Sequence, residues 1–182
     1  MIILITGGAR SGKSAFCEKM VAKHNRSVLY IATSVVEDDD MASRVAKHRA
    51  KRPSHWRTIE EFHQLGDVIR SQRQGDEAVM LECITTMIAH LLYELSQGED
   101  PNLIDFAPLA RRIDEQIEDL IAAALACPTP IYLVTNELGM SVTPENRLAR
   151  HFVDIAGQVN QRLAEKAHSV WLVVSGIGVN IK

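Results

Sequence analysis

No stretch of this sequence is long and apolar enough to cross a lipid bilayer. The longest uninterrupted apolar run, Leu120 to Cys127, has eight residues, whereas a spanning helix needs roughly 20. The first residues lack the basic lead of a secretory signal and soon reach two glycines. Cysteine is scarce: Cys17, Cys83 and Cys127 are the only three, and they form no metal-binding spacing. We therefore expect a protein of the reducing cytoplasm that does not insert into a membrane.

An excess of charge of one sign is also lacking. The 182 residues carry a formal net charge of -3, with 20 Lys and Arg against 23 Asp and Glu. Nucleic-acid backbones require a basic excess, so we expect no nucleic acid partner. One exception is local. The basic stretch, residues 47–57, contains Lys47, His48, Arg49, Lys51, Arg52, His55 and Arg57.

Short β-branched apolar runs, separated by segments of helix length, predict an α/β fold. The runs are Ile2–Ile5, Val28–Ile31, Val79–Leu81, Ile131–Val134 and Val170–Val174. They are continuously apolar, as in strands that helices cover on both faces, so we expect a three-layer fold with a mostly parallel central sheet. The composition, 46% hydrophobic and 24% charged, is that of one ordinary domain, and we assign residues 1–182 to it.

Apolar stripes place two of the intervening helices. One runs from about Phe106 to Ala126. The residues that it is expected to turn toward the core are Leu109, Ile113, Ile117, Leu120 and Ala124. The other is expected to begin with Thr143 as N-cap and Pro144 as first helical residue. Its stripe consists of Leu148, Phe152, Ile155, Val159 and Leu163.

Residues 7–14 read Gly-Gly-Ala-Arg-Ser-Gly-Lys-Ser, the pattern G-x-x-x-x-G-K-[ST] between an apolar strand and a helix. Gly7, Gly8 and Gly12 let backbone N–H groups turn inward around a polyphosphate, and the following helix adds its positive end. Lys13 is expected to reach the terminal phosphates, and the Ser14 hydroxyl to bind Mg²⁺. The motif predicts a P-loop NTPase of RecA-like fold.

A second oxygen ligand for Mg²⁺ is expected at the end of another strand. Glu82 follows the apolar run that ends at Leu81 and can hold the ion directly or through water. Ligands of open α/β sheets gather at the carboxyl ends of the strands. Five residues that follow strands should therefore share one rim: Gly7, Thr33, Glu82, Asn136 and Gly176.

The region between Thr33 and Ala78 is longer than one crossover helix needs, and we expect a mobile functional insertion at about residues 33–60. Within it, His48 stands beside Arg49 and Arg52. A neutral imidazole can attack phosphorus while guanidinium groups stabilise charge on the oxygens. A P-loop alone also suits a plain small-molecule kinase without a covalent intermediate or a nucleotide-dependent regulatory switch, so these classes stay open.

Several sequence blocks together carry a resemblance to one family. Besides the P-loop they are His48 with Arg52-Pro53, Trp56-Arg57-Thr58, Leu81-Glu82-Cys83-Ile84-Thr85-Thr86-Met87, Val134-Thr135-Asn136-Glu137, Pro144-Glu145-Asn146-Arg147 and Ser175-Gly176. They resemble the bifunctional adenosylcobinamide kinase / adenosylcobinamide-phosphate guanylyltransferase of cobalamin biosynthesis. The likeness runs from end to end.

The resemblance implies two reactions and a homotrimer. ATP or GTP first phosphorylates the aminopropanol hydroxyl of adenosylcobinamide, and the sequence does not choose between the two nucleotides. GTP then transfers GMP to an enzyme histidine with release of pyrophosphate. The GMP passes to adenosylcobinamide phosphate and gives adenosylcobinamide-GDP. By motif position the histidine is His48 rather than the nearby His55.

The resemblance also implies which residues contact the nucleotide. They are Gly7, Gly8, Ala9, Arg10, Ser11, Gly12, Lys13, Ser14, Ala32, Thr33, Ser34, Arg49, Ala50, Lys51, Arg52, Glu60 and Glu82. Ala50 and Lys51 are expected to contribute through the backbone. The polar segment Asn136 to Arg150 suits a large, amide-fringed corrinoid and helix-surface salt bridging equally well, so the corrinoid contacts stay open.

Overall fold

The computed structural model describes residues 1–24, 27–34, 53–97, 99–100 and 103–182. Within these ranges, seven strands form one sheet in the order β3-β2-β4-β5-β1-β6-β7. The strands are β1 (Ile2–Gly7), β2 (Val28–Ala32), β3 (Arg57–Glu60), β4 (Ala78–Glu82), β5 (Ile131–Asn136), β6 (Ser169–Val174) and β7 (Ile177–Asn180). The helices are α1 (Lys13–His24), α3 (Leu65–Gln72), α4 (Ile84–Leu95), α5 (Phe106–Ala126) and α6 (Arg147–Lys166).

The sheet is parallel except at one edge, where β7 pairs antiparallel with β6. The interior strand β1 lies between β5 and β6 and is buried along its whole length. Such strands need apolar side chains on both faces, which explains the continuous apolar runs in the sequence. The prediction of a mostly parallel sheet is therefore confirmed.

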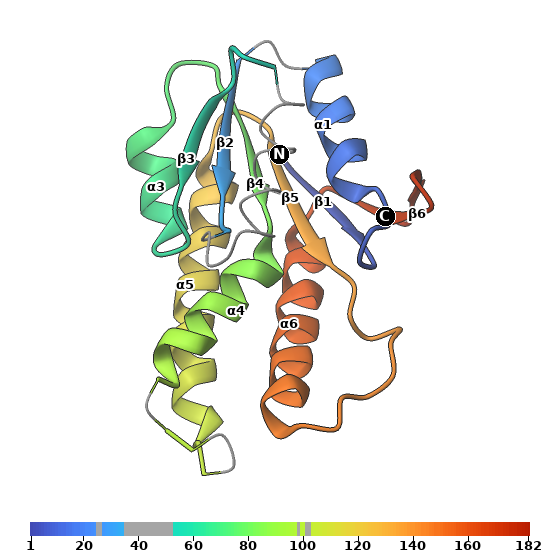
Figure 1. Cartoon of the computed structure of the whole chain (residues 1–182). Coiled ribbons are helices and arrows are strands. Elements are labelled where there is room, and N and C mark those ends of the chain that lie inside the picture. The colour runs from blue at the N-terminus through green and yellow to red at the C-terminus, as the bar shows by residue number, and fades with distance from the viewer. Residues whose placement is uncertain (25–26, 35–52, 98, 101–102) are drawn as a thin grey trace.

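Helices pack on both faces of the sheet, and the faces differ. One set of strand residues, including Leu4 and Leu81, packs with α3, α4, α5 and α6. The alternate set, including Ile5 and Met80, packs with Cys17 and Val21 of α1. In Figure 1, α1 accordingly lies on the opposite side of the strands from α3 and α5. The described residues thus form the three layers expected from the sequence.

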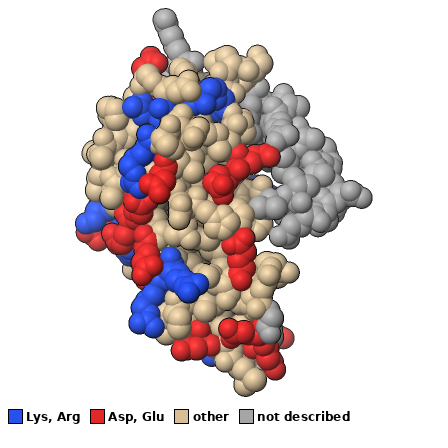
Figure 2. Space-filling model, turned by 90° about the vertical axis from the view of Figure 1, so that its left-hand side faces the viewer, with Lys and Arg blue, Asp and Glu red and all other residues tan. Residues whose placement is uncertain are grey.

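Charged side chains tie the outer helices together. Arg70 of α3 bonds Asp67 and, at 2.7 Å, Asp119 of α5. Arg162 of α6 bonds Asp114 of α5 at 2.7 Å. On the side of the molecule drawn in Figure 2, basic side chains lie beside acidic ones rather than in a patch of one sign. No helix of the described residues is long and apolar enough to cross a membrane.

Of the two helices predicted from their apolar stripes, one has the expected bounds and the other begins later than expected. α5 has the expected bounds and core-facing residues. α6 keeps its stripe, but its expected start is wrong. Asn146 is the N-cap, because its side chain accepts a hydrogen bond from the Ala149 N–H at 2.7 Å. Since an asparagine that bonds the third residue of a helix caps it well, α6 begins at Arg147.

Candidate active site

The loop that joins β1 to α1, residues 7–14, forms the phosphate cradle. Gly12 has a φ of 88°, which favours glycine. A Cβ at Gly7 would lie 2.5 Å from the carbonyl oxygen of Val173. Position 7 therefore requires glycine because a side chain would collide with Val173, and position 12 because its backbone conformation disfavours other residues.

The cradle is fastened to the turn between β6 and β7. The Gly176 N–H donates to the Ser11 carbonyl at 2.7 Å. A Cβ at Gly12 would lie 2.9 Å from the Cα of Gly176, so the two backbones touch. The blocks at residues 7–14 and 175–176, far apart in sequence, thus belong to one structural unit.

Lys13 opens α1 and points its ammonium into the cradle. Its side chain is buried, and Nζ donates to the Gly8 carbonyl at 3.2 Å. Burial lowers the pKa of Lys13, and the nearby Cys83 and Glu82 oppose that shift. A buried ammonium has lost much of its hydration, so an incoming phosphate would stabilise it strongly.

Glu82, at the end of β4, stands at the centre of the site. Ser14 of α1 donates a hydrogen bond to its Oε1, and Tyr30 of β2 donates to its Oε2. Tyr30 is fully buried, so its hydrogen bond holds the Glu82 carboxylate from the protein interior. Sequence reasoning missed Tyr30, because its role depends on the parallel pairing of β2 with β4.

The donors at this point suit a hard cation. Ser14 and Glu82 offer oxygen atoms, which Mg²⁺ prefers, and Mg²⁺ in nucleotide sites takes its other ligands from phosphates and water. In the described part of the chain, no group of three or more His, Cys, Asp or Glu side chains gathers as a metal site. Ser14 and Glu82 are therefore the residues that could hold the ion here.

Thr33 and Cys83 brace the backbone beside Glu82. Thr33 Oγ1 lies 2.8 Å from both the Cys83 carbonyl oxygen and the Cys83 backbone nitrogen. The Cys83 Sγ lies 2.8 Å from the Thr86 Oγ1 and serves as N-cap of α4. Cys83 is buried, as are Cys17 and Cys127, and as N-cap it also directs the positive end of α4 toward the site.

A second network holds the end of β5. The side-chain amide of Asn136 donates to Thr85 Oγ1 at 2.8 Å. Asn160 of α6 accepts from the buried Thr135 hydroxyl at 2.7 Å and donates to the Asn136 carbonyl at 2.9 Å. The sequence offered one unused signal for this network: a threonine in a buried strand needs a hydrogen-bond partner.

The structure brings most of the expected site residues together. Gly7, Thr33, Glu82 and Asn136 lie at or directly after the carboxyl ends of their parallel strands, and Gly176 lies in the turn that follows β6, so the expected shared rim is confirmed. Ala32 pairs in register with Glu82 on one side and with Glu60 on the other. Glu60 is exposed at the edge strand β3, and Ser34 is half-buried.

The residues of the basic stretch that are expected to act on the nucleotide, and Ala50 among them, belong to the part of the chain that is not described. This holds for His48, Arg49, Ala50, Lys51 and Arg52, and for most of the expected insertion at 33–60. Residues 57–60 of that insertion form β3. The roles of the other residues stay predictions.

A glycine-built cradle, a buried lysine and a strand-end carboxylate at the carboxyl rim of a parallel sheet define a P-loop nucleotide-binding protein. Two solved structures share this fold. One, an ATPase of a bacterial type III secretion system, has a TM-score of 0.61 and 13% identity over 94% of this chain and 50% of its own. The other, the assembled ATPase EscN of enteropathogenic E. coli, has a TM-score of 0.56 and 14% identity over 96% and 43%. The RecA-like fold is thereby confirmed.

Closer relatives narrow the class. The family model for cobinamide kinase / cobinamide phosphate guanyltransferase matches residues 3–181. The bifunctional adenosylcobalamin biosynthesis proteins CobU of Salmonella typhimurium and Escherichia coli are 55% and 52% identical over 100% of both chains. CobP of Pseudomonas aeruginosa is 37% identical over 98% of this chain and 96% of its own. The chain belongs to this family of two-activity transferases, which confirms the resemblance drawn from the sequence blocks.

Proposed function

We propose that this chain phosphorylates adenosylcobinamide with ATP or GTP and then joins GMP from GTP to the new phosphate. The observation that carries the proposal is the phosphate cradle at residues 7–14, on which Lys13, Ser14 and Glu82 converge. Membership in a family named for both activities directs that cradle to a cobinamide acceptor. The whole chain, residues 1–182, acts as one nucleotide-binding transferase domain.

In the first reaction, the aminopropanol hydroxyl oxygen attacks the γ-phosphorus. The bond from γ-phosphorus to the bridging oxygen breaks, the nucleoside diphosphate leaves and the hydroxyl proton is released. The cradle N–H groups and Lys13 balance the charge on the phosphate oxygens, and Ser14 and Glu82 would hold Mg²⁺. When bound, the ion would supply positive charge that offsets the charge of the phosphate groups.

In the second reaction, a ring nitrogen of His48 attacks the α-phosphorus of GTP. A phosphorus–nitrogen bond forms, the bond to the bridging oxygen breaks and pyrophosphate leaves. A phosphate oxygen of adenosylcobinamide phosphate then attacks the same phosphorus, which frees His48 and gives adenosylcobinamide-GDP. Arg49 and Arg52 stabilise the charge on the non-bridging oxygens.

One cradle cannot present the γ- and the α-phosphorus to the same acceptor position. We therefore propose that the nucleotide and His48 change position relative to each other between the two reactions.

The remaining assignments are a homotrimer and a cytoplasmic location. The three free, buried cysteines support a reducing compartment, and sedimentation of the purified protein tests the trimer.

GTP labelled at the α-phosphate tests the covalent step. The protein is expected to take up an acid-labile, alkali-stable label, and His48→Asn is expected to abolish it. His55→Asn is the matched control: His55 is exposed, and this variant should label as the wild type does. Phosphorylated acceptor without labelled protein would indicate a plain kinase. Slow hydrolysis with neither product would indicate a regulatory switch.

A further inference from the structure

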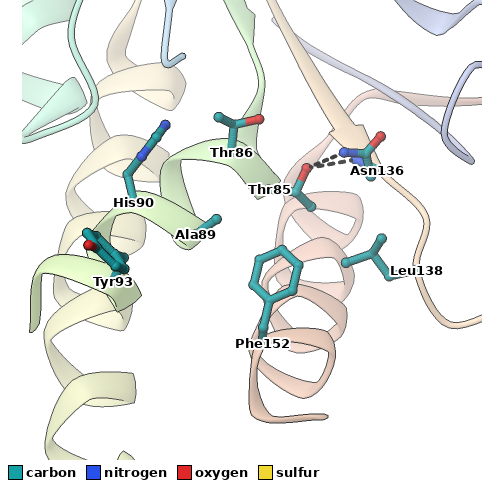
Figure 3. Close-up of a pocket in the computed structure, with 8 residues that line it drawn as sticks. All are labelled: Thr85, Thr86, Ala89, His90, Tyr93, Asn136, Leu138 and Phe152. Atoms are coloured by element: carbon teal, nitrogen blue, oxygen red, sulfur yellow. Dashed lines mark hydrogen bonds between the residues drawn. The ribbon is translucent and has the colours of Figure 1, made fainter. Parts of the chain in front are cut away.

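A groove between α4 and α6 opens next to the phosphate cradle. It consists of two adjoining cavities of about 380 Å³ and about 370 Å³, which share the walls Ala89, Tyr93 and Phe152. Figure 3 shows the first of them, with side chains of α4 on one side and Asn136, Leu138 and Phe152 on the other. We call the two cavities together the α4–α6 groove.

The inner end of the groove lies at the rim of the sheet. Thr85, Thr86 and Asn136 line it there. Asn136 pairs in register with Gly7, the first residue of the cradle. The next residue, Glu137, donates its N–H to the Gly7 carbonyl at 3.0 Å. A molecule in the groove can therefore extend one end to a phosphate in the cradle.

The lining of the groove differs chemically from the cradle. Neither cavity is lined by a Lys, Arg, Asp or Glu among the described residues. Its walls are mainly apolar and aromatic, with His90, Thr85 and Thr86 in the first cavity. Each cavity has one side-chain amide, Asn136 in the first and Asn146 in the second. Tyr93 is 61% exposed on one wall, much for so large a ring. This lining suits a neutral, apolar surface with polar groups at its margins and does not suit a second phosphate group.

We propose that the α4–α6 groove binds the acceptor of both reactions, an inference that rests on the proposed function. The groove holds one apolar edge of the corrinoid, with the amide side chains of that edge at Asn136 and Asn146. The aminopropanol arm extends past Thr86 to the cradle. A corrinoid is larger than either cavity, so most of it stays outside the groove and in solvent.

Filling the groove tests this assignment. Ala89 is exposed on α4 and lines both cavities, so Ala89→Trp blocks the groove without entering the core. Ala122→Trp is the matched control, because Ala122 is exposed on α5 and lines neither cavity. The measurements are the Kd of adenosylcobinamide, its KM and kcat, the Kd of GTP, and label uptake from α-labelled GTP. Tyr93→Ala, which removes one wall, serves as a second variant.

Ala89→Trp should raise the Kd and KM of adenosylcobinamide about tenfold or more, a weakening of about 1.4 kcal/mol. Label uptake and the Kd of GTP should stay within twofold, and Tyr93→Ala should raise the acceptor KM roughly threefold.

Unchanged acceptor binding in folded Ala89→Trp and Tyr93→Ala overturns the proposal. A changed sedimentation coefficient with unchanged acceptor binding also overturns it and assigns the groove to a second copy of the chain. Wild-type protein that binds adenosylcobinamide but takes no label contradicts the second reaction and leaves the groove assignment standing.

Discussion

The phosphate cradle and the α4–α6 groove meet at one rim but are built by different means. Backbone shapes the cradle: Gly7 and Gly12 are required by contacts with Val173 and Gly176. Side chains shape the groove, between two helices that each begin with a side-chain cap, Cys83 for α4 and Asn146 for α6. A cradle of backbone recognises what all nucleoside triphosphates share, whereas a groove of side chains can be specific for one acceptor.

The cradle and the groove also serve different steps of the two reactions. Both reactions need a triphosphate in the cradle, so damage there should affect both. The groove contacts the acceptor, so damage there should spare any step that takes place without acceptor. Guanylylation of the protein by GTP alone is that step, and it distinguishes the two regions.

The largest effect is expected from Lys13→Ala. The buried ammonium is the positive side chain that points into the described cradle, and its removal should lower kcat/KM of both reactions about a thousandfold. Lys19→Ala is the control, because Lys19 is exposed on the same helix. Initial rates of each half-reaction measure the effect. Full guanylylation by Lys13→Ala would contradict a cradle shared by both reactions.

Glu82 and Tyr30 provide the next comparison. Glu82→Gln removes the charge and should lower both activities about a hundredfold, because Mg²⁺ is held less tightly. Tyr30→Phe keeps the carboxylate but removes its buried donor, and should raise the Mg²⁺ concentration needed for half-maximal activity about tenfold. Magnesium titrations of activity measure both effects. Equal Mg²⁺ dependence in wild type and Tyr30→Phe would show that this hydrogen bond does not position Glu82.

Asn160→Ala should affect the groove end of the rim and leave the cradle intact. It removes the partner of the buried Thr135 hydroxyl and of the Asn136 carbonyl, which should cost about 1–2 kcal/mol of stability. Since Asn136 is then less firmly held, the acceptor KM should rise roughly fivefold. Denaturant unfolding and acceptor titrations measure the change, with exposed Gln161→Ala on α6 as control. An equal rise in the KM of GTP would contradict the separation of the two regions.

The smallest effect concerns pH. Burial lowers the pKa of Lys13 below the usual value of 10.5. The charged form binds phosphate, so nucleotide affinity should be full below the lowered pKa and weaken as pH rises through it. We expect a fewfold loss of GTP affinity in the alkaline range and a smaller loss in Lys13→Arg, since arginine keeps its charge there. Equilibrium binding of GTP between neutral pH and pH 10 measures both. Acceptor affinity should not follow this curve, because no Lys, Arg, Asp or Glu lines the described groove.

Local patterns in the sequence predicted the fold better than they predicted its edges. The five apolar runs are strands, and α5 was placed correctly, because burial selects those residues directly. The edge strands β3 and β7 and the helix α3 were not predicted. β3 reads Arg-Thr-Ile-Glu, half exposed, and lacks a continuous apolar run. β7 follows Ser175-Gly176, a turn pair whose hairpin signal was not used.

For the candidate site too, local sequence motifs were predicted and contacts between distant residues were not. The loop of residues 7–14 and its place between β1 and α1 were predicted, because its residues are contiguous in one motif, whereas their roles with a nucleotide stay predictions. Tyr30, Thr85 and Asn160 were not, because their partners lie 52, 51 and 25 residues away along the chain. Such pairs depend on strand register and helix rotation, which a single sequence without structure does not specify.

The bond between Gly176 and Ser11 has a consequence for the order in which the protein matures on the ribosome. The phosphate loop leaves the ribosome before its anchor, because Gly176, like both neighbours of β1, follows it by more than 100 residues along the chain. A nascent chain therefore carries the loop sequence well before the strands and the turn that hold the loop in place. The loop can take its observed conformation against Gly176 only after the β6–β7 hairpin has been synthesised.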